Sequence, residues 1–121
     1  MPATGGCLCG AVRYVIDGPL RDVIVCHCSR CRRTHGGAAP YSRCADADLT
    51  IEAGDALRWY VVDERERGFC SSCGASLFWK VTGSDTVSVA AGSIDPPTGL
   101  RTVGHIYVED AGDYEEDVPA T

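Results

Sequence analysis

The arrangement of eight cysteines within 121 residues constrains the fold of this chain more than any other feature of its sequence. All of them except Cys44 fall into three short groups, which are Cys7-x-Cys9, Cys26-x-Cys28-x-x-Cys31 and Cys70-x-x-Cys73. Disulfide frameworks usually spread their cysteines more widely, whereas thiolates separated by one or two residues are typical ligands of zinc. The spacing therefore predicts reduced cysteines that hold metal.

The first and last groups together supply four thiolates for a closed, structural zinc site, from Cys7, Cys9, Cys70 and Cys73. If Cys7 and Cys9 lie on a strand, the alternation of side chains points both sulfur atoms to one face. The Cys70-Ser-Ser-Cys73 segment is typical of a zinc knuckle, in which the following Gly74 adopts a left-handed conformation. The alternatives are reduced core thiols or a redox-active pair. A redox pair should open a helix, whereas strand-like residues flank this segment on both sides.

The middle group offers only three thiolates, those of Cys26, Cys28 and Cys31. Three protein ligands leave the fourth position of a tetrahedral zinc ion open, and open positions are where zinc catalyses reactions. We therefore predict a second, open zinc site. The alternative is a second structural site closed by His27, His35 or Cys44. We expect instead that His27 points away from the metal, that His35 caps a turn and that Cys44 is a buried thiol.

Three arginines, Arg30, Arg32 and Arg33, stand beside the middle group in a chain that is otherwise acidic. Their guanidinium groups create a local positive field, which attracts anionic ligands. Arg32 and Arg33 are our candidates for offsetting the negative charge of the thiolates and for binding a carboxylate of a substrate. The alternative is that these arginines are simply solvated.

Short segments rich in β-branched and aromatic residues, separated by Gly, Pro or Asp, predict a mainly β fold. The expected strands are 11–16, 23–26, 57–62, 76–81, 86–90 and 103–108, and 31–35 can form one helical turn. The length predicts a single domain over residues 1–121. Residues 110–121 should form an acidic C-terminal tail that is only partly ordered.

The balance of 11 basic and 17 acidic residues gives a net charge of -6, which argues against a protein that binds nucleic acid. No stretch approaches the roughly 18 apolar residues of a membrane span, and the N-terminus has no signal-peptide pattern. We therefore expect a cytoplasmic protein with no membrane partner, either a monomer or a weak homodimer.

Three motifs carry a resemblance to a known family: Gly6-Cys7-x-Cys9-Gly10-Ala11-Val12-x-Tyr14, Cys26-His27-Cys28-Ser29-x-Cys31-Arg32-Arg33 and Arg67-Gly68-Phe69-Cys70-x-x-Cys73-Gly74-x-x-Leu77. They resemble the GFA family, named for glutathione-dependent formaldehyde-activating enzyme and also called the CENP-V/GFA domain. Weaker motifs at 91–95 and 105–108 extend the resemblance to about Tyr114.

The resemblance implies an Mss4-like fold of short, bent antiparallel sheets around a structural zinc. It implies that Cys7, Cys9, Cys70 and Cys73 hold this zinc and that Cys26, Cys28 and Cys31 hold a second zinc. The implied activity is that of a carbon-sulfur lyase, the addition of glutathione to formaldehyde to give S-(hydroxymethyl)glutathione.

Three classes of function follow from these observations. The first is a zinc enzyme that acts on a small thiol such as glutathione and on formaldehyde or a related aldehyde. The second is a non-catalytic, zinc-stabilised binding module of the same fold. The third is a methionine sulfoxide reductase, for which only Cys44 is free to act as the catalytic cysteine, in surroundings that do not resemble the reductase motif.

Overall fold

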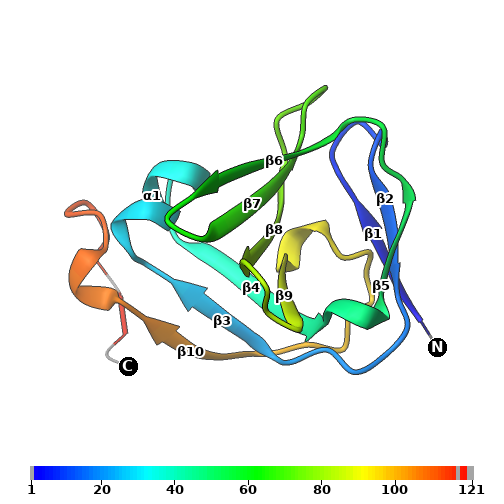
Figure 1. Ribbon diagram of the computed structural model, residues 1–121. Coiled ribbons are helices and arrows are strands. Elements are labelled where there is room, and N and C mark those ends of the chain that lie inside the picture. The colour runs from blue at the N-terminus through cyan, green and yellow to red at the C-terminus, as the bar shows by residue number, and fades with distance from the viewer. Residues whose placement is uncertain (1, 117, 120–121) are drawn as a thin grey trace.

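The computed structural model describes residues 2–116 and 118–119 and shows a mostly β protein (Figure 1). Its strands are β1 Ala3–Gly6, β2 Arg13–Ile16, β3 Val23–Cys26, β4 Ala39–Ala45, β5 Leu49–Ala53, β6 Leu57–Val62, β7 Arg65–Cys70, β8 Ser76–Val81, β9 Thr86–Ala90 and β10 Thr102–Ile106. Its helices are α1 Ser29–His35 and the single-turn 3₁₀ helices η1 Asp46–Asp48, η2 Ala91–Ser93 and η3 Val108–Asp110. No helix in this part of the chain has the length and apolar composition needed to cross a membrane.

The strands form two sheets, with the order β1-β2-β5 in the small sheet and β10-β3-β4-β9-β8-β7-β6 in the large one. Every pairing is antiparallel except that of β3 with β10. The prediction of a mainly β fold of short antiparallel strands is therefore confirmed, apart from this pair. The parallel pair is possible because β3 and β10 are separated by most of the chain, which provides the long crossover that parallel strands need.

All six predicted strands are present, although two have shifted ends. β2 begins at Arg13 rather than residue 11, because the preceding residues belong to a loop that carries cysteines. β10 ends at Ile106, since Tyr107 adopts a left-handed conformation with φ of 55° and is the N-cap of η3. The prediction missed β1, β4 and β7, whose sequences contain Gly, Pro or alternating charges rather than a run of β-branched residues, and it also missed β5.

The main core lies between the small sheet and one face of the large sheet. Its buried residues are Val12, Tyr14, Ile16, Cys44, Cys70, Leu77, Phe78, Val87, Val89 and Ile94. The rings of Tyr14 and Phe78 meet edge to face across the two sheets, with centroids 5.3 Å apart. This packing fixes the small sheet against the end of β7, where one of the cysteine groups lies.

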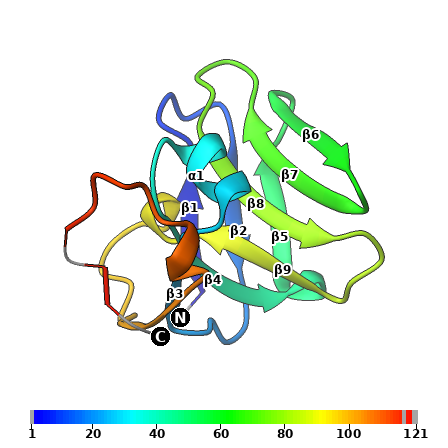
Figure 2. The same ribbon diagram turned by 90° about the vertical axis from the view of Figure 1, so that its left-hand side faces the viewer.

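The other face of the large sheet carries α1 and the C-terminal segment. Figure 2 shows α1 and η3 in front of this sheet. A second, smaller group of buried residues, Cys31, Ala39 and Tyr41, packs here under α1, together with Cys26, Cys28, Trp79 and Ala90. The two faces of one sheet therefore separate the cysteine groups into two environments.

Candidate metal centres

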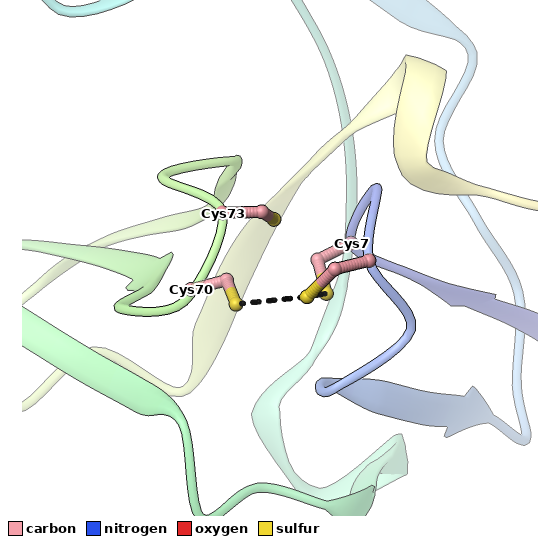
Figure 3. Close-up of side chains that lie close together, drawn as sticks. Cys7, Cys70 and Cys73 are labelled. Carbon is pink, nitrogen blue, oxygen red and sulfur yellow. Dashed lines mark hydrogen bonds between the residues drawn. The ribbon is translucent and has the colours of Figure 1, made fainter.

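The first cysteine cluster joins two loops that are far apart in sequence. Cys7 and Cys9 lie in the loop between β1 and β2 rather than on a strand, so strand alternation does not place their sulfur atoms. Cys70 ends β7, and Cys73 follows in the turn before β8. The four sulfur atoms lie within 4.8 Å of one another, and Figure 3 shows Cys70 and Cys73 facing Cys7.

Both loops turn through a glycine in the left-handed conformation. Gly10 has φ of 82° and Gly74 has φ of 79°, a region that residues with a Cβ atom rarely adopt. The backbone N–H of Gly74 donates to the carbonyl of Cys70 at 2.7 Å, which closes the expected knuckle. The backbone N–H of Val12 donates to the Cys7 sulfur at 3.2 Å, a contact that favours the thiolate. The turn in each loop, rather than a strand, therefore brings the two sulfur atoms of that loop together.

The spacing of these sulfur atoms fits zinc. A tetrahedral ion with Zn–S bonds of about 2.3 Å requires sulfur atoms about 3.8 Å apart. The Cys7–Cys9 and Cys9–Cys70 sulfur distances are 3.7 Å and 3.8 Å. Thiolate ligands favour zinc over hard cations such as magnesium or calcium.

Cys7 and Cys9 in this cluster have different pKa values. Burial raises the pKa of Cys7, but the N–H of Val12 and the neighbouring thiols lower this pKa by more, so that its value is about 6. The N–H of Ala11 lowers the pKa of Cys9, but the neighbouring thiols, Cys7 first, raise it to about 11. Four thiolates therefore repel one another in this cluster unless a cation neutralises them.

The second cluster lies at the start of α1. Cys26 ends β3, Cys28 immediately precedes the helix and Cys31 is buried in its first turn. Their sulfur atoms lie within 4.8 Å of one another. Cys28 is the N-cap of α1, and its sulfur accepts a hydrogen bond from the N–H of Cys31 at 3.3 Å. The hydrogen bond from Cys31 lowers the pKa of Cys26 to about 6, whereas Cys26 and burial raise the pKa of Cys31.

No fourth metal-ligating side chain of residues 2–116 or 118–119 joins this second cluster. His27 is buried and, as expected, directed elsewhere, with its Nε2 2.9 Å from Nδ1 of His105. His35 places its Nε2 2.8 Å from the hydroxyl of Tyr41, and Gly36 rather than His35 caps the helix. Cys44 is buried in the main core, as expected, and burial raises its pKa to about 11. The described residues therefore supply three ligands to this second cluster.

A cavity of about 600 Å³ opens at this second cluster. It is lined by the three cysteines, by aromatic residues that include Tyr41 and Trp79, and by guanidinium groups. These guanidinium groups belong to Arg21, Arg30, Arg43, Arg65 and Arg67. We call this space the arginine cavity. Asp110 is the acidic residue in its lining.

The two arginines chosen from the sequence do not line the arginine cavity. Arg32 is half-buried on α1, and Arg33 lines a neighbouring cavity of about 460 Å³, which shares Arg30 and Arg67 with the first. Their role beside the metal stays a prediction. Arg65 and Arg67 line the arginine cavity but were not among the predicted site residues, although their spacing of two residues on a strand places both side chains on one face.

Comparison with known proteins gives three findings. The family model described as glutathione-dependent formaldehyde-activating enzyme, GFA, matches residues 2–110. A Halomonas elongata protein named provisionally as a glutathione-dependent formaldehyde-activating enzyme is 36% identical over 84 residues, which cover 62% of this chain. The match covers 53% of that protein, so the chain spans about half the length of this curated relative.

A crystal structure of a Rhodobacter sphaeroides protein superposes with a TM-score of 0.67 at 26% identity, and the match covers 84% of this chain and 98% of that one. The family match covers nearly the whole described chain and includes both cysteine clusters. The chain therefore belongs to the GFA family.

Proposed function

We propose that this protein is a cytoplasmic, zinc-dependent carbon-sulfur lyase that joins glutathione, or another small thiol, to formaldehyde or a related aldehyde. The observation that carries the proposal is the second cysteine cluster. Its three ligands would leave one position of a tetrahedral zinc ion open, and all three cysteines line a cavity large enough for a small molecule. The family to which the chain belongs supports the choice of thiol and aldehyde.

In the proposed reaction, the thiol sulfur forms a bond to the carbonyl carbon, the C=O π bond breaks, and the thiol proton passes to the carbonyl oxygen to give a hydroxymethyl thioether. A zinc ion held by Cys26, Cys28 and Cys31 would act as a Lewis acid and a template. No oxidant or reductant is needed. The reaction therefore depends mainly on holding sulfur and carbonyl carbon together in the right orientation.

The guanidinium groups of the arginine cavity aid this positioning in two ways. Three thiolates leave a zinc site with a formal charge of -1, which repels an incoming thiolate. The guanidinium groups of the arginine cavity offset this charge and attract the carboxylates of an acidic thiol. The closed cluster of Cys7, Cys9, Cys70 and Cys73 has no open position, and we assign it a structural role within one domain.

The test is the rate of adduct formation between glutathione and ¹³C-formaldehyde, measured by exchange NMR with zinc-loaded protein. We expect the wild-type protein to accelerate the exchange and Cys28→Ser to abolish the acceleration, because this change removes a ligand of the open site. Cys44→Ser is the matched control and should retain the activity. Folded wild-type protein with two zinc ions but no acceleration would contradict the proposal and favour the non-catalytic binding module.

A further inference from the structure

The strand register aligns two arginines on either side of Trp79 in the arginine cavity. Arg43 on β4 pairs with Ser88 on β9, Ser88 pairs with Trp79 on β8, and Trp79 pairs with Arg67 on β7. All four residues line the cavity. Adjacent strands lie about 4.8 Å apart, so the backbones of Arg43 and Arg67 are roughly 14 Å apart across this row.

Each end of the row carries additional positive charge. Arg21 accompanies Arg43, and burial, together with the nearby charge of Arg43, lowers the pKa of Arg21. Arg30 and Arg65 accompany Arg67 in the cavity lining. The cavity therefore has two cationic ends separated by an aromatic floor.

Most of this positive charge is not neutralised by a carboxylate of the described residues, although Arg21 and Arg65 donate hydrogen bonds to backbone carbonyls. Of these five arginines, only Arg30 has a carboxylate within ion-pair distance among the described residues, that of Asp63 at 2.9 Å. One guanidinium nitrogen of Arg67, Nη1, is buried without a hydrogen-bond partner in the same part of the chain. Leaving a buried charged donor unpaired is costly, which favours a ligand that supplies an acceptor.

The second cysteine cluster opens into the same cavity as this row. Cys26, Cys28 and Cys31 line the cavity together with both arginines, and they belong to the same buried group as Tyr41 and Trp79. A molecule whose sulfur reaches the three cysteines therefore enters the cavity that also holds both cationic ends.

We propose that Arg43 and Arg67 are the specificity-determining residues of this site, and that they select an elongated thiol with an acidic group at each end. The proposal rests on the function proposed above for the same site. An extended chain of three residues spans roughly 10 Å. This length suits two arginine side chains that extend toward each other from backbones about 14 Å apart. Compact thiols with one carboxylate can reach only one of these arginines, and neutral thiols can reach neither.

The test measures binding by calorimetry and needs no reaction. The probes are S-methylglutathione, which has both carboxylates but no free thiol, and two analogues in which one or the other carboxylate is replaced by an amide. We expect each replacement to weaken binding to the zinc-loaded wild-type protein about tenfold, the loss of one charge-assisted contact.

The variants Arg43→Gln and Arg67→Gln assign the two ends. Each variant should bind S-methylglutathione about tenfold more weakly than the wild type does. Each variant should also bind one of the two amide analogues as tightly as S-methylglutathione, and this analogue should differ between the two variants. Arg101→Gln, at an exposed position outside the cavity lining, is the matched control and should bind as the wild type does. If Arg67→Gln does not fold, Arg67→Lys replaces it. Lysine keeps the positive charge but lacks the planar guanidinium group that binds a carboxylate through two hydrogen bonds.

Equal binding of all three probes to the wild-type protein would overturn the proposal, as would variants that bind like the wild type. Because the probes cannot form an adduct, the result is independent of catalysis. Selective binding without adduct formation would support Arg43 and Arg67 as specificity-determining residues and would contradict the proposed reaction. Adduct formation without selective binding would do the reverse.

Discussion

At the scale of single residues, position in the fold decides what each cysteine does. Seven of the eight cysteines meet in two clusters on opposite sides of the large sheet, whereas Cys44 is isolated in the core. The sequence already predicted these groupings, because short spacing brings the ligands of each group together and the two pairs combine to the four thiolates of a closed zinc site. It could not predict the arginine cavity, which depends on the register of Arg43, Ser88, Trp79 and Arg67 across four strands.

Cys44 should behave as a packing residue. We expect Cys44→Ala to leave the zinc content unchanged and to cost about 1 kcal/mol of stability, as is typical of a small core truncation. In the zinc-loaded wild type, alkylation of Cys44 by iodoacetamide should be slow at pH 8 and should accelerate up to about pH 11, since the raised pKa of about 11 keeps the thiol protonated. Rapid alkylation of Cys44 at pH 7 would support the reductase alternative instead.

Gly74 should be required for the conformation of the knuckle. Gly74→Ala places a Cβ atom at φ of 79°, where nothing lies within 4 Å, so backbone strain is its only direct cost. We expect about 1 kcal/mol of destabilisation and weaker zinc binding at the first cluster. Gly92→Ala is the matched control, because Gly92 also has free space but no positive φ. Equal melting temperatures for the two variants would contradict the assignment.

At the scale of elements, α1 shows how metal ligands and local structure depend on each other. A helix of seven residues is too short to be stable alone. Its first turn includes Cys31, and Cys28 is its N-cap. The sequence predicted one helical turn at 31–35, but it could not show that the helix starts two residues earlier, at Ser29, with Cys28 as its N-cap.

Loss of metal from the second cluster should therefore loosen α1. In Cys28→Ser, we expect the backbone amides of α1 to exchange hydrogen at least about tenfold faster than in the zinc-loaded wild type, while the amides of β8 and β9 keep their protection. Serine is a good N-cap residue, so the change cannot be attributed to the loss of the cap. Hydrogen-exchange mass spectrometry provides the measurement, with Cys44→Ala as the control. Unchanged exchange in α1 would show that the helix does not depend on the metal.

The strands that the sequence did not predict are those that tertiary pairing stabilises. β4 contains Pro40 and Arg43, yet it occupies a central position between β3 and β9. β7 alternates arginine with other residues and pairs with β6 and β8. Local propensity is a weak guide at such positions, because pairing with both neighbours outweighs it.

At the scale of the whole molecule, the first cluster ties the N-terminal loop to the end of the large sheet. Complete removal of zinc by a strong chelator under reducing conditions should unfold the protein. Structural zinc contributes on the order of 10 kcal/mol, which is comparable with the entire stability of a small domain. Circular dichroism before and after chelation tests this, and a native spectrum from metal-free, reduced protein would contradict it.

The central claim is that the two clusters have different roles, and zinc content measured together with thermal unfolding of two variants tests it most directly. Cys9→Ser breaks the closed cluster and should yield insoluble or molten protein. Cys28→Ser breaks the open cluster and should yield folded protein with one zinc ion, a melting temperature within a few degrees of the wild type and no glutathione-linked activity. If Cys28→Ser unfolds the protein as completely as Cys9→Ser, the second cluster is structural as well, and the proposed active site is wrong.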